Sequence, residues 1–586
     1  MSAATDAERP SSAPVRNEPR TRFLGGRDLL VLVGLVTLGA LIYGHGVIGH
    51  LDSRFLGTGQ KPGHDQAQIS WFFAWTAFAI KNGHNPLFTN YIYAPEGLSL
   101  PWATSALLLG LLMFPVTVAT SAFVSFNLLA LLAPGLAGWS AYLLCREVLD
   151  ERPSPASVAG GLLFMFSSYI ATEAGSHLNL TLVFLVPIFA LLAIRRIRGR
   201  IGRRAFVASS AAVVAAQLLI SSEVLASLMI FGVIALAVYA LVGERSNAGL
   251  AARTAVEALA GAAIAAIVCW PFFYELARHS GSLVAIQGGM LGLDPANLIT
   301  TSRESAIPGI GNAFLSAARL SPNVTEQLAY VGLPLIVTLG VFFWSSRRQA
   351  IARFCALFMA VVLALALGSL LHLDGEAVNS FPLPWQLIDG LPLVSAAITV
   401  RFALFLWLAI VVAVAWLVRE GGTLRWILYG LTIVSLLPNA VLVTNATAIP
   451  KPRLMTDHQL LASTIPGGST VISAPFGYAG TQMAWQIESD FHFKLVGGYG
   501  TSNKPLPLTH YTRLVDALEQ HRIRGRLRRP LCRLIHNTGA SFAIADPGKQ
   551  RSWHVLRNEL GLEPSYVGGL LVFDLRSVAA PGGACA

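Results

Sequence analysis

Residues 124–145, VSFNLLALLAPGLAGWSAYLLC, form a run of 22 residues without a charged side chain. An α-helix of about 20 residues is long enough to cross the hydrocarbon core of a bilayer. Comparable apolar runs predict ten further membrane helices at 28–48, 156–172, 180–194, 205–222, 224–243, 254–272, 328–344, 352–371, 403–418 and 425–444. The pattern therefore predicts a mainly α, polytopic helical membrane protein with about 11 spans.

The composition supports the same class of protein. Of 586 residues, 54% are hydrophobic and only 12% are charged, with a mean hydropathy of +0.59. This excludes an ordinary soluble globular protein, which needs more polar surface. The net charge of +11 does not indicate a nucleic-acid partner, because most basic residues lie between apolar runs. Five cysteines are too few and too scattered to predict a disulfide framework or a metal cluster.

The basic residues also orient the chain. With the N-terminus in the cytoplasm, twenty Lys and Arg residues fall in inside segments and seven fall in outside segments before residue 450. An excess of Lys and Arg marks cytoplasmic loops. We therefore expect a multi-pass protein of the cell membrane (inner or plasma), with a cytoplasmic N-terminus and an extracytoplasmic C-terminus.

One apolar run, 103–121, does not fit this alternation. If it crossed the membrane, every later loop would change sides and the arginine cluster at 195–204 would face outside. We interpret the run as a re-entrant or interfacial segment packed on other helices.

The chain divides into three predicted parts. Residues 1–27 form a disordered cytoplasmic tail, and 28–449 form the transmembrane domain. Residues 450–586 form an extracytoplasmic α/β domain with strands at 469–475, 541–545 and 570–575 and helices at 510–529 and 550–560. Its arginines between 522 and 533 are interpreted as a solvated basic face, with binding to anionic headgroups as the alternative.

The outside loops 50–102, 273–327 and 372–402, with a shorter one at 167–179, carry the polar side chains of interest. Carboxylates can take a proton from an attacking hydroxyl, and the arginine fork suits a phosphate. The candidate site residues are His64, Asp65, Glu173, His177, Arg303 and Arg401.

The first loop also contains an aromatic segment, 69–80. Its apolar side chains fall on one helical face, which predicts an interfacial helix with Trp71 and Trp75 at the depth of the lipid headgroups.

Several segments carry a family resemblance: GHDQAQISWFFAW (63–75), FNLLALLAPGLAGWSAYLLCREV (126–148), SSYIATEAGSHLNLTLVFLVPIFALL (167–192), PLPWQLIDGLPLVSAAITVRF (382–402), ISAPFGYAGTQMAWQ (472–486) and VGGYGTS (496–502). Their order resembles a bacterial, uncharacterised subgroup of the GT-C superfamily, polytopic glycosyltransferases that use polyprenyl-phosphate sugars. The resemblance implies an essential acidic residue in the first outside loop, here Asp65. Many GT-C enzymes have paired acids there, whereas this chain has His64 before Asp65. The resemblance therefore predicts no particular cofactor and leaves a divalent metal open.

The resemblance implies transfer of a sugar, with inversion, from a polyprenyl-phosphate donor to an extracytoplasmic glycan, lipid or protein. In this hypothesis Asp65 acts as base on the acceptor hydroxyl or orients it. Arg401 and Arg303 hold the phosphate, and Glu173 and His177, with His64 beside Asp65, shape the substrate site. The predicted partners are the lipid-linked donor, the bilayer and the acceptor, with no nucleic acid and no assigned metal ligand.

Two other functions remain open at this stage. A lipid or glycan flippase also needs many helices, but the polar residues here lie in large loops and not in broken central helices. A non-catalytic assembly protein for the cell envelope would account for the absent acidic pair. Translocation of a labelled lipid without a glycan product would favour the first alternative. Copurifying envelope partners without sugar transfer would favour the second.

Overall fold

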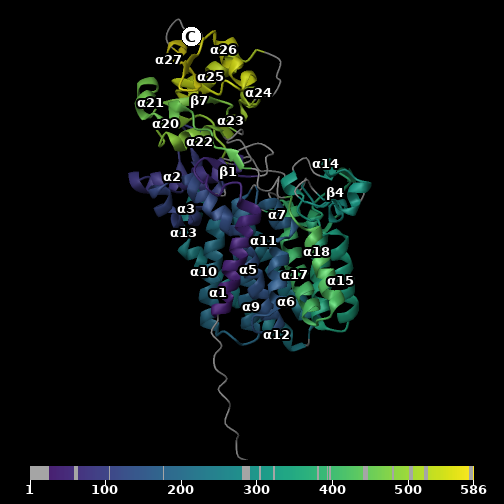
Figure 1. Ribbon diagram of the computed structural model, residues 1–586. Helices are drawn as coiled ribbons and strands as arrows, with labels where there is room; N and C mark the ends of the chain where they lie inside the picture. The colour runs from purple at the N-terminus through teal and green to yellow at the C-terminus, as the bar shows by residue number, and fades with distance from the viewer. Residues whose placement is uncertain are drawn as a thin grey trace, which may run out of the picture.

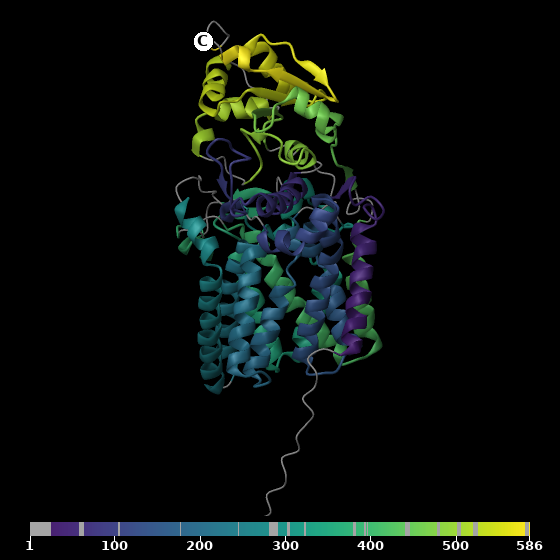
Figure 2. The same cartoon turned by 90° about the vertical axis from the view of Figure 1, so that its left-hand side faces the viewer.

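The computed structural model describes residues 25–585, except 58–63, 104–105, 176, 244, 280–290, 302–304, 321–323, 379–381, 392–393, 395–396, 440–445, 478–480, 501–505, 520–525 and 580–584. A bundle of long helices carries a smaller unit of helices and strands at one end (Figure 1). A view from the side shows the same two parts, with α2 (His64–Asn82) lying across the end of the bundle beneath the smaller unit (Figure 2). Most of the tail predicted at 1–27 lies outside the described residues.

Each predicted span coincides with a helix of the bundle. These helices are α1 (Gly26–Gly44), α5 (Ala122–Leu149), α6 (Pro155–Met165), α9 (Leu185–Ile197), α10 (Arg203–Ile220), α11 (Ser222–Val242), α12 (Arg245–Val268), α15 (Gly332–Ser346), α16 (Ala350–Ala366), α17 (Ala403–Arg419) and α18 (Thr423–Ser435). Within the described part of the chain, seven helical segments are long and apolar enough to cross a membrane, and three shorter apolar helices accompany them. The mainly α membrane fold is confirmed, and the number of spans stays a prediction.

The ambiguous segment 103–121 forms two short helices, α3 (Leu107–Leu112) and α4 (Phe114–Ala119). At 1.5 Å per residue each is about 9 Å long, too short to cross a bilayer. Gly110 of α3 lies so close to α2 that an added Cβ would be 2.8 Å from the Thr76 hydroxyl. The segment therefore packs on neighbouring helices, as predicted.

Small residues allow the central helices to approach closely. A Cβ on Gly161 of α6 would lie 2.7 Å from the carbonyl oxygen of Gly138 in α5, and one on Gly135 would lie 2.4 Å from the Val36 Cα of α1. In lipid the hydrophobic effect does not hold helices together, so membrane helices associate through close packing. Small residues at the crossing points allow that close packing. Helix α17 packs against both α5 and α6 and is almost entirely buried.

Short elements connect the spans. They are β1 (Arg54–Leu56), β2 (Phe88–Thr89), β3 (Leu98–Ser99), η1 (Leu100–Ala103), α7 (Ser168–Glu173), α8 (Leu178–Thr181), α13 (Trp270–Arg278), η3 (Pro295–Leu298), η4 (Ile310–Ala313), α14 (Ala317–Leu320), η5 (Val324–Glu326), β4 (Leu371–Leu373), β5 (Glu376–Val378), η6 (Pro384–Leu387), η8 (Thr399–Phe402) and β6 (Ala446–Ala448). Strand β1 pairs antiparallel with β6, so the start of the first loop is joined to the segment that follows the last bundle helix.

The C-terminal region, residues 450–585, is built on a mixed five-stranded sheet in the order β10-β11-β9-β7-β8. Its strands are β7 (Thr470–Ala474), β8 (Lys494–Leu495), β9 (Phe542–Ala545), β10 (Ser565–Val567) and β11 (Leu570–Asp574). Strand β7 is parallel to β8 and β9, whereas β11 is antiparallel to β9 and β10. The three predicted strands are present, and β8 and β10 were missed because two or three residues show no alternation.

Helices surround this sheet: α20 (Arg453–Thr456), α21 (His458–Thr464), α22 (Thr481–Glu488), α23 (Leu506–Thr509), α24 (Thr512–Leu518), α25 (Arg528–Thr538), α26 (Gln550–Leu560) and α27 (Arg576–Ala579). The predicted helix at 550–560 is confirmed by α26. The single helix predicted at 510–529 is wrong, since α24 ends at Leu518 and α25 begins at Arg528. Pro530 explains the new start, because proline fits the first turn of a helix but not its interior.

The tryptophans of α2 are buried in protein and do not face lipid headgroups, so that prediction is wrong. Trp71 and Trp75 are buried and stack with ring centroids 5.8 Å apart. Both pack against Phe491 of the C-terminal region, and Trp71 Nε1 donates a hydrogen bond of 2.7 Å to Gln486 of α22. The aromatic face of α2 is therefore an internal interface with the C-terminal region.

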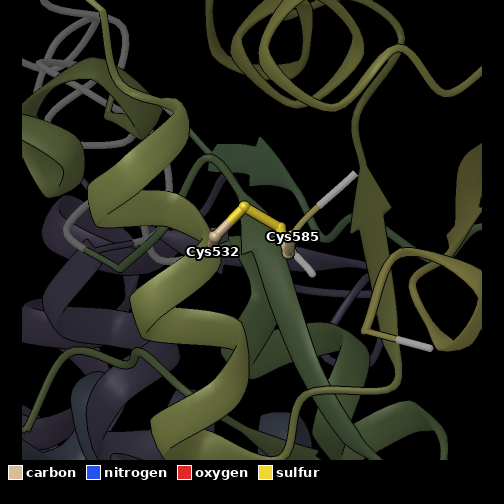
Figure 3. Close-up of a disulfide and its surroundings, with 2 residues drawn as sticks. All are labelled: Cys532 and Cys585. Atoms are coloured by element: carbon tan, nitrogen blue, oxygen red, sulfur yellow. A yellow bond between two sulfur atoms is a disulfide. The ribbon is translucent and has the colours of Figure 1, made fainter. Parts of the chain in front are cut away.

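A disulfide joins Cys532 of α25 to Cys585 near the end of the chain (Figure 3). The spacing of the cysteines did not predict this bond, because its two residues are 53 positions apart. Cys145, Cys269 and Cys355 are buried free thiols, as their apolar surroundings suggest.

The disulfide predicts a specific pattern of thiol labelling. Denatured full-length protein treated with a maleimide polymer should gain three mass tags without reductant and five after reduction, because five cysteines include one bonded pair. A Cys532→Ser/Cys585→Ser variant should take three tags under both conditions and lose about 2–4 kcal/mol of stability. Five tags on unreduced wild-type protein would contradict the bond.

Candidate functional site

Asp65 lies in the first turn of α2, where an acidic side chain favours helix formation. Its Oδ1 accepts a hydrogen bond of 3.0 Å from the Tyr499 hydroxyl of the C-terminal region. Its Oδ2 is 3.4 Å from His177 Nε2. The Asp65 side chain is 25% exposed, so the carboxylate is held from both sides and still open to an incoming group.

His177 connects Asp65 to a second carboxylate. Its Nδ1 is 2.6 Å from Glu173 Oε2, across the break between α7 and α8. The Glu173 side chain is fully buried, and its Oε1 has no hydrogen-bond partner within the described structure. An unsatisfied buried carboxylate oxygen is costly, and such exceptions concentrate where function requires them.

The surroundings of His177 change its proton affinity. Burial lowers the pKa of the imidazole, but the negative charges of Glu173 and Asp65 and the hydrogen bond with Glu173 outweigh burial and raise this pKa to about 9. Burial also raises the pKa of Glu173, with His177 acting in the opposite direction. At neutral pH a proton is therefore retained on the histidine–glutamate pair, beside Asp65.

Arg401 organises the adjacent polar residues. Its Nη2 and Nε bond the two Glu326 oxygens at 2.5 and 3.1 Å, and its Nη1 bonds Glu223 Oε2 at 2.7 Å. Arg401 lies in η8, directly before α17. Glu326 is the last residue of η5, and Glu223 is the second residue of α11. This fork is the strong, two-pronged geometry of arginine with carboxylate.

The structure thus brings Asp65, Glu173, His177 and Arg401 from three separate loops into one cluster. His64 is the first residue of α2, next to Asp65 in the chain, and Arg303 lies outside the described residues.

Sequence reasoning missed Tyr499 as a partner of Asp65 and the two glutamates that pair with Arg401. The segment VGGYGTS, which contains Tyr499, carries part of the GT-C resemblance, but no local pattern links it to the first loop.

The cluster does not fit a metal ion. Both ring nitrogens of His177 face carboxylates, so the imidazole separates Asp65 from Glu173 and does not join them around a common point. Across the described residues, no three His, Cys, Asp or Glu side chains are arranged to hold a metal.

An apolar cavity of about 570 Å³ lies elsewhere, among α9, α11, α12, α16 and α17. Its lining is almost wholly apolar and includes Arg198, next to the last residue of α9, and Asn247, near the start of α12. We therefore base the candidate site on the polar cluster and not on cavity size.

The ion pairs of Arg401 predict a large effect on stability. Arg401→Met leaves Glu326, whose side chain is 3% exposed, without its counter-charge, and should cost about 3–5 kcal/mol. Arg401→Lys should destabilise the protein less than Arg401→Met, because an ammonium keeps the positive charge but cannot form the two-pronged pair with a carboxylate. Thermal unfolding in detergent would measure both variants, with the exposed Arg348→Met as the control. An Arg401→Met melting temperature equal to that of the control would contradict this role.

His177 predicts a pH-dependent stability. The folded-state pKa is raised to about 9, so the stabilisation is fully present below the unfolded value of about 6.5 and is lost as pH rises through about 9. His177→Gln should therefore lower the melting temperature most at and below about pH 6.5, and the difference from wild type should shrink as pH rises through about 9. Exposed His50→Gln serves as control. A difference that stays constant across this range would refute the assignment.

The chain was compared with known proteins. It resembles the arabinofuranosyltransferase AftD from Mycobacteria, with TM-score 0.60 and 14% identity, over 95% of this chain and 40% of that one. It also resembles the archaeal oligosaccharyltransferase AglB from Archaeoglobus fulgidus, with TM-score 0.50 and 13% identity, over 89% of this chain and 69% of that one. The chain thus spans about two fifths of the length of AftD. No curated protein matches the sequence.

Both relatives are glycosyltransferases of the GT-C superfamily, so the predicted GT-C fold is confirmed. A family model matches residues 31–437, well over half of the chain. The chain therefore has a GT-C fold and belongs to the family described as Domain of unknown function (DUF6311).

Proposed function

We propose that this protein is an inverting membrane glycosyltransferase that takes a sugar from a polyprenyl-phosphate donor and adds it to an extracytoplasmic acceptor. The observation that carries the proposal is the chain of contacts Tyr499–Asp65–His177–Glu173 at one end of a GT-C helical bundle. It leaves one carboxylate partly exposed and fixes its orientation from two directions.

Asp65 is the proposed base. The acceptor hydroxyl gives its proton to Asp65 as its oxygen attacks the anomeric carbon, and the bond from that carbon to the phosphate oxygen breaks. The lipid phosphate leaves with the bonding electrons, and attack from the opposite side inverts the anomeric centre. His177 lies 3.4 Å from one oxygen of Asp65 and, together with the Tyr499 hydroxyl on the other oxygen, holds the carboxylate in place before the reaction.

The proposed contacts with the donor phosphate remain predictions. Arg401 is already bound to two carboxylates, so a phosphate would have to share or displace them. We assign Arg401 first to positioning the loops around Glu173. Arg303 and His64 stay proposed substrate contacts, because in sequence they belong to the predicted outside loops 273–327 and 50–102.

We also propose that the C-terminal region, 450–586, lies outside the cytoplasm, above the transmembrane part 28–449, with the tail 1–27 on the cytoplasmic side. The disulfide between Cys532 and Cys585 supports this placement, because disulfides persist in oxidising compartments. The distribution of basic residues between inside and outside loops supports it independently.

Asp65→Asn tests the proposed chemistry. In membranes supplied with a radiolabelled polyprenyl-phosphate sugar and total envelope acceptor, the variant should transfer sugar about 10²–10⁴ times more slowly than wild type, the usual contribution of a general base. Asp150→Asn is the matched control, because its carboxylate is 64% exposed at the end of α5.

If folded Asp65→Asn protein transferred sugar at the wild-type rate, the proposed role of Asp65 as base would be wrong. Movement of the labelled lipid across the bilayer without a glycan product would instead favour a flippase.

A further inference from the structure

A second cavity lies between the first loop and the C-terminal region. It has a volume of about 420 Å³, and its walls come from the segment 93–96, from Val496, from α23 with the turn that follows it, and from α25. This volume is within the range of about 300–1,000 Å³ that is typical of small-molecule sites. We call it the interdomain cavity. None of the contacts around Asp65 described above uses its lining.

The lining of the interdomain cavity combines apolar residues with polar ones. Among the polar ones are Tyr93, Glu96, His510, Tyr511, Arg533 and Asn537. Asn537 Nδ2 donates a hydrogen bond of 2.9 Å to the Tyr511 hydroxyl, which fixes that ring in the wall. Glu96 and Arg533 are exposed and have no ion-pair partner in the part of the chain that the structure describes.

This combination matches the chemistry of a sugar. Sugar hydroxyls both donate and accept hydrogen bonds, so they need carboxylate, guanidinium and amide groups in one wall. The rings of Tyr93 and Tyr511 offer rigid apolar faces with a polar tip, which suits the C–H faces of a sugar ring. A nucleic acid would need more positive charge than Arg533 supplies.

The interdomain cavity is joined to the candidate base through one short segment. The Tyr93 hydroxyl donates to the Gly498 carbonyl at 2.9 Å and accepts from the Gly500 amide at 3.1 Å. Tyr499, between these glycines, donates to Asp65 at 3.0 Å. A Cβ on Gly500 would lie 2.2 Å from the end of the Leu98 side chain, so any larger residue there would have to displace that side chain. Tyr93 in the wall of the cavity and Asp65, the proposed base, therefore both bind the segment Gly498–Gly500.

We propose that the interdomain cavity binds the acceptor, and that this acceptor is a glycan chain, held by Glu96 and Arg533 while its terminal hydroxyl reaches Asp65. The inference deepens the proposed glycosyltransferase function and rests on it. It makes the C-terminal region the part of the chain that selects the acceptor.

The test measures glycan binding separately from transfer. Full-length protein in detergent is titrated with fluorescently tagged oligosaccharides released from the envelope of the cells that naturally make it. Wild type and Asp65→Asn should bind equally, because Asp65 acts on the hydroxyl and not on the body of the chain. Arg533→Ala and Glu96→Ala should each weaken binding about tenfold or more. Arg551→Ala is the control, an exposed arginine of α26 outside the cavity.

Equal binding by wild type and both cavity variants, or no binding by wild type, overturns the inference. The transfer assay then separates the two proposals. If Arg533→Ala raises the acceptor KM and leaves kcat unchanged, both proposals are supported. If transfer proceeds with an unchanged acceptor KM, the cavity inference is wrong and the glycosyltransferase stands. If glycan binds in the cavity but wild type transfers no sugar, the proposed enzyme is wrong and the cavity remains a glycan site.

Discussion

The polar end of the bundle depends on the pairing of buried charge around Arg401. Its guanidinium joins the entry of α17 to Glu326 in the long loop after α13 and to Glu223 at the start of α11. Removing one partner from such a group leaves an uncompensated charge, so these segments must stay together. Glu173 lies within the field of the same guanidinium and, through His177, sets the position of Asp65. One end of the apolar bundle thus carries a cluster of charged side chains held together by ion pairs.

Much of the fold follows from hydropathy alone. The uncharged runs at 124–145 and 403–418 fall on α5 and α17, two heavily buried helices of the bundle, because only an α-helix satisfies its own backbone in lipid. The same reasoning failed for Trp71 and Trp75. Helical periodicity shows that a face is apolar, but it does not distinguish lipid from a protein surface formed some 400 residues later, as the hydrogen bond to Gln486 illustrates.

The candidate site was only partly predictable. Asp65, Glu173, His177 and Arg401 could be singled out because ionisable side chains close to apolar spans are costly at membrane depth, and because the resemblance implies an acid in the first loop. Their actual partners were not found. Tyr499 contacts Asp65 across 434 residues, and Glu326 meets Arg401 across 75. Such pairings are made by tertiary packing, and no local spacing encodes them.

The reach of Tyr499 also bears on how this architecture can be cut and recombined. The match to the family ends at residue 437, yet the hydroxyl that orients Asp65 comes from beyond that boundary. A polypeptide trimmed to the matched segment would keep its carboxylate and imidazole but lose one of the two restraints on the carboxylate. Exchanging terminal modules between relatives would therefore change the restraints on Asp65, and a chimera would keep both of them only if its incoming module supplied an equivalent phenol.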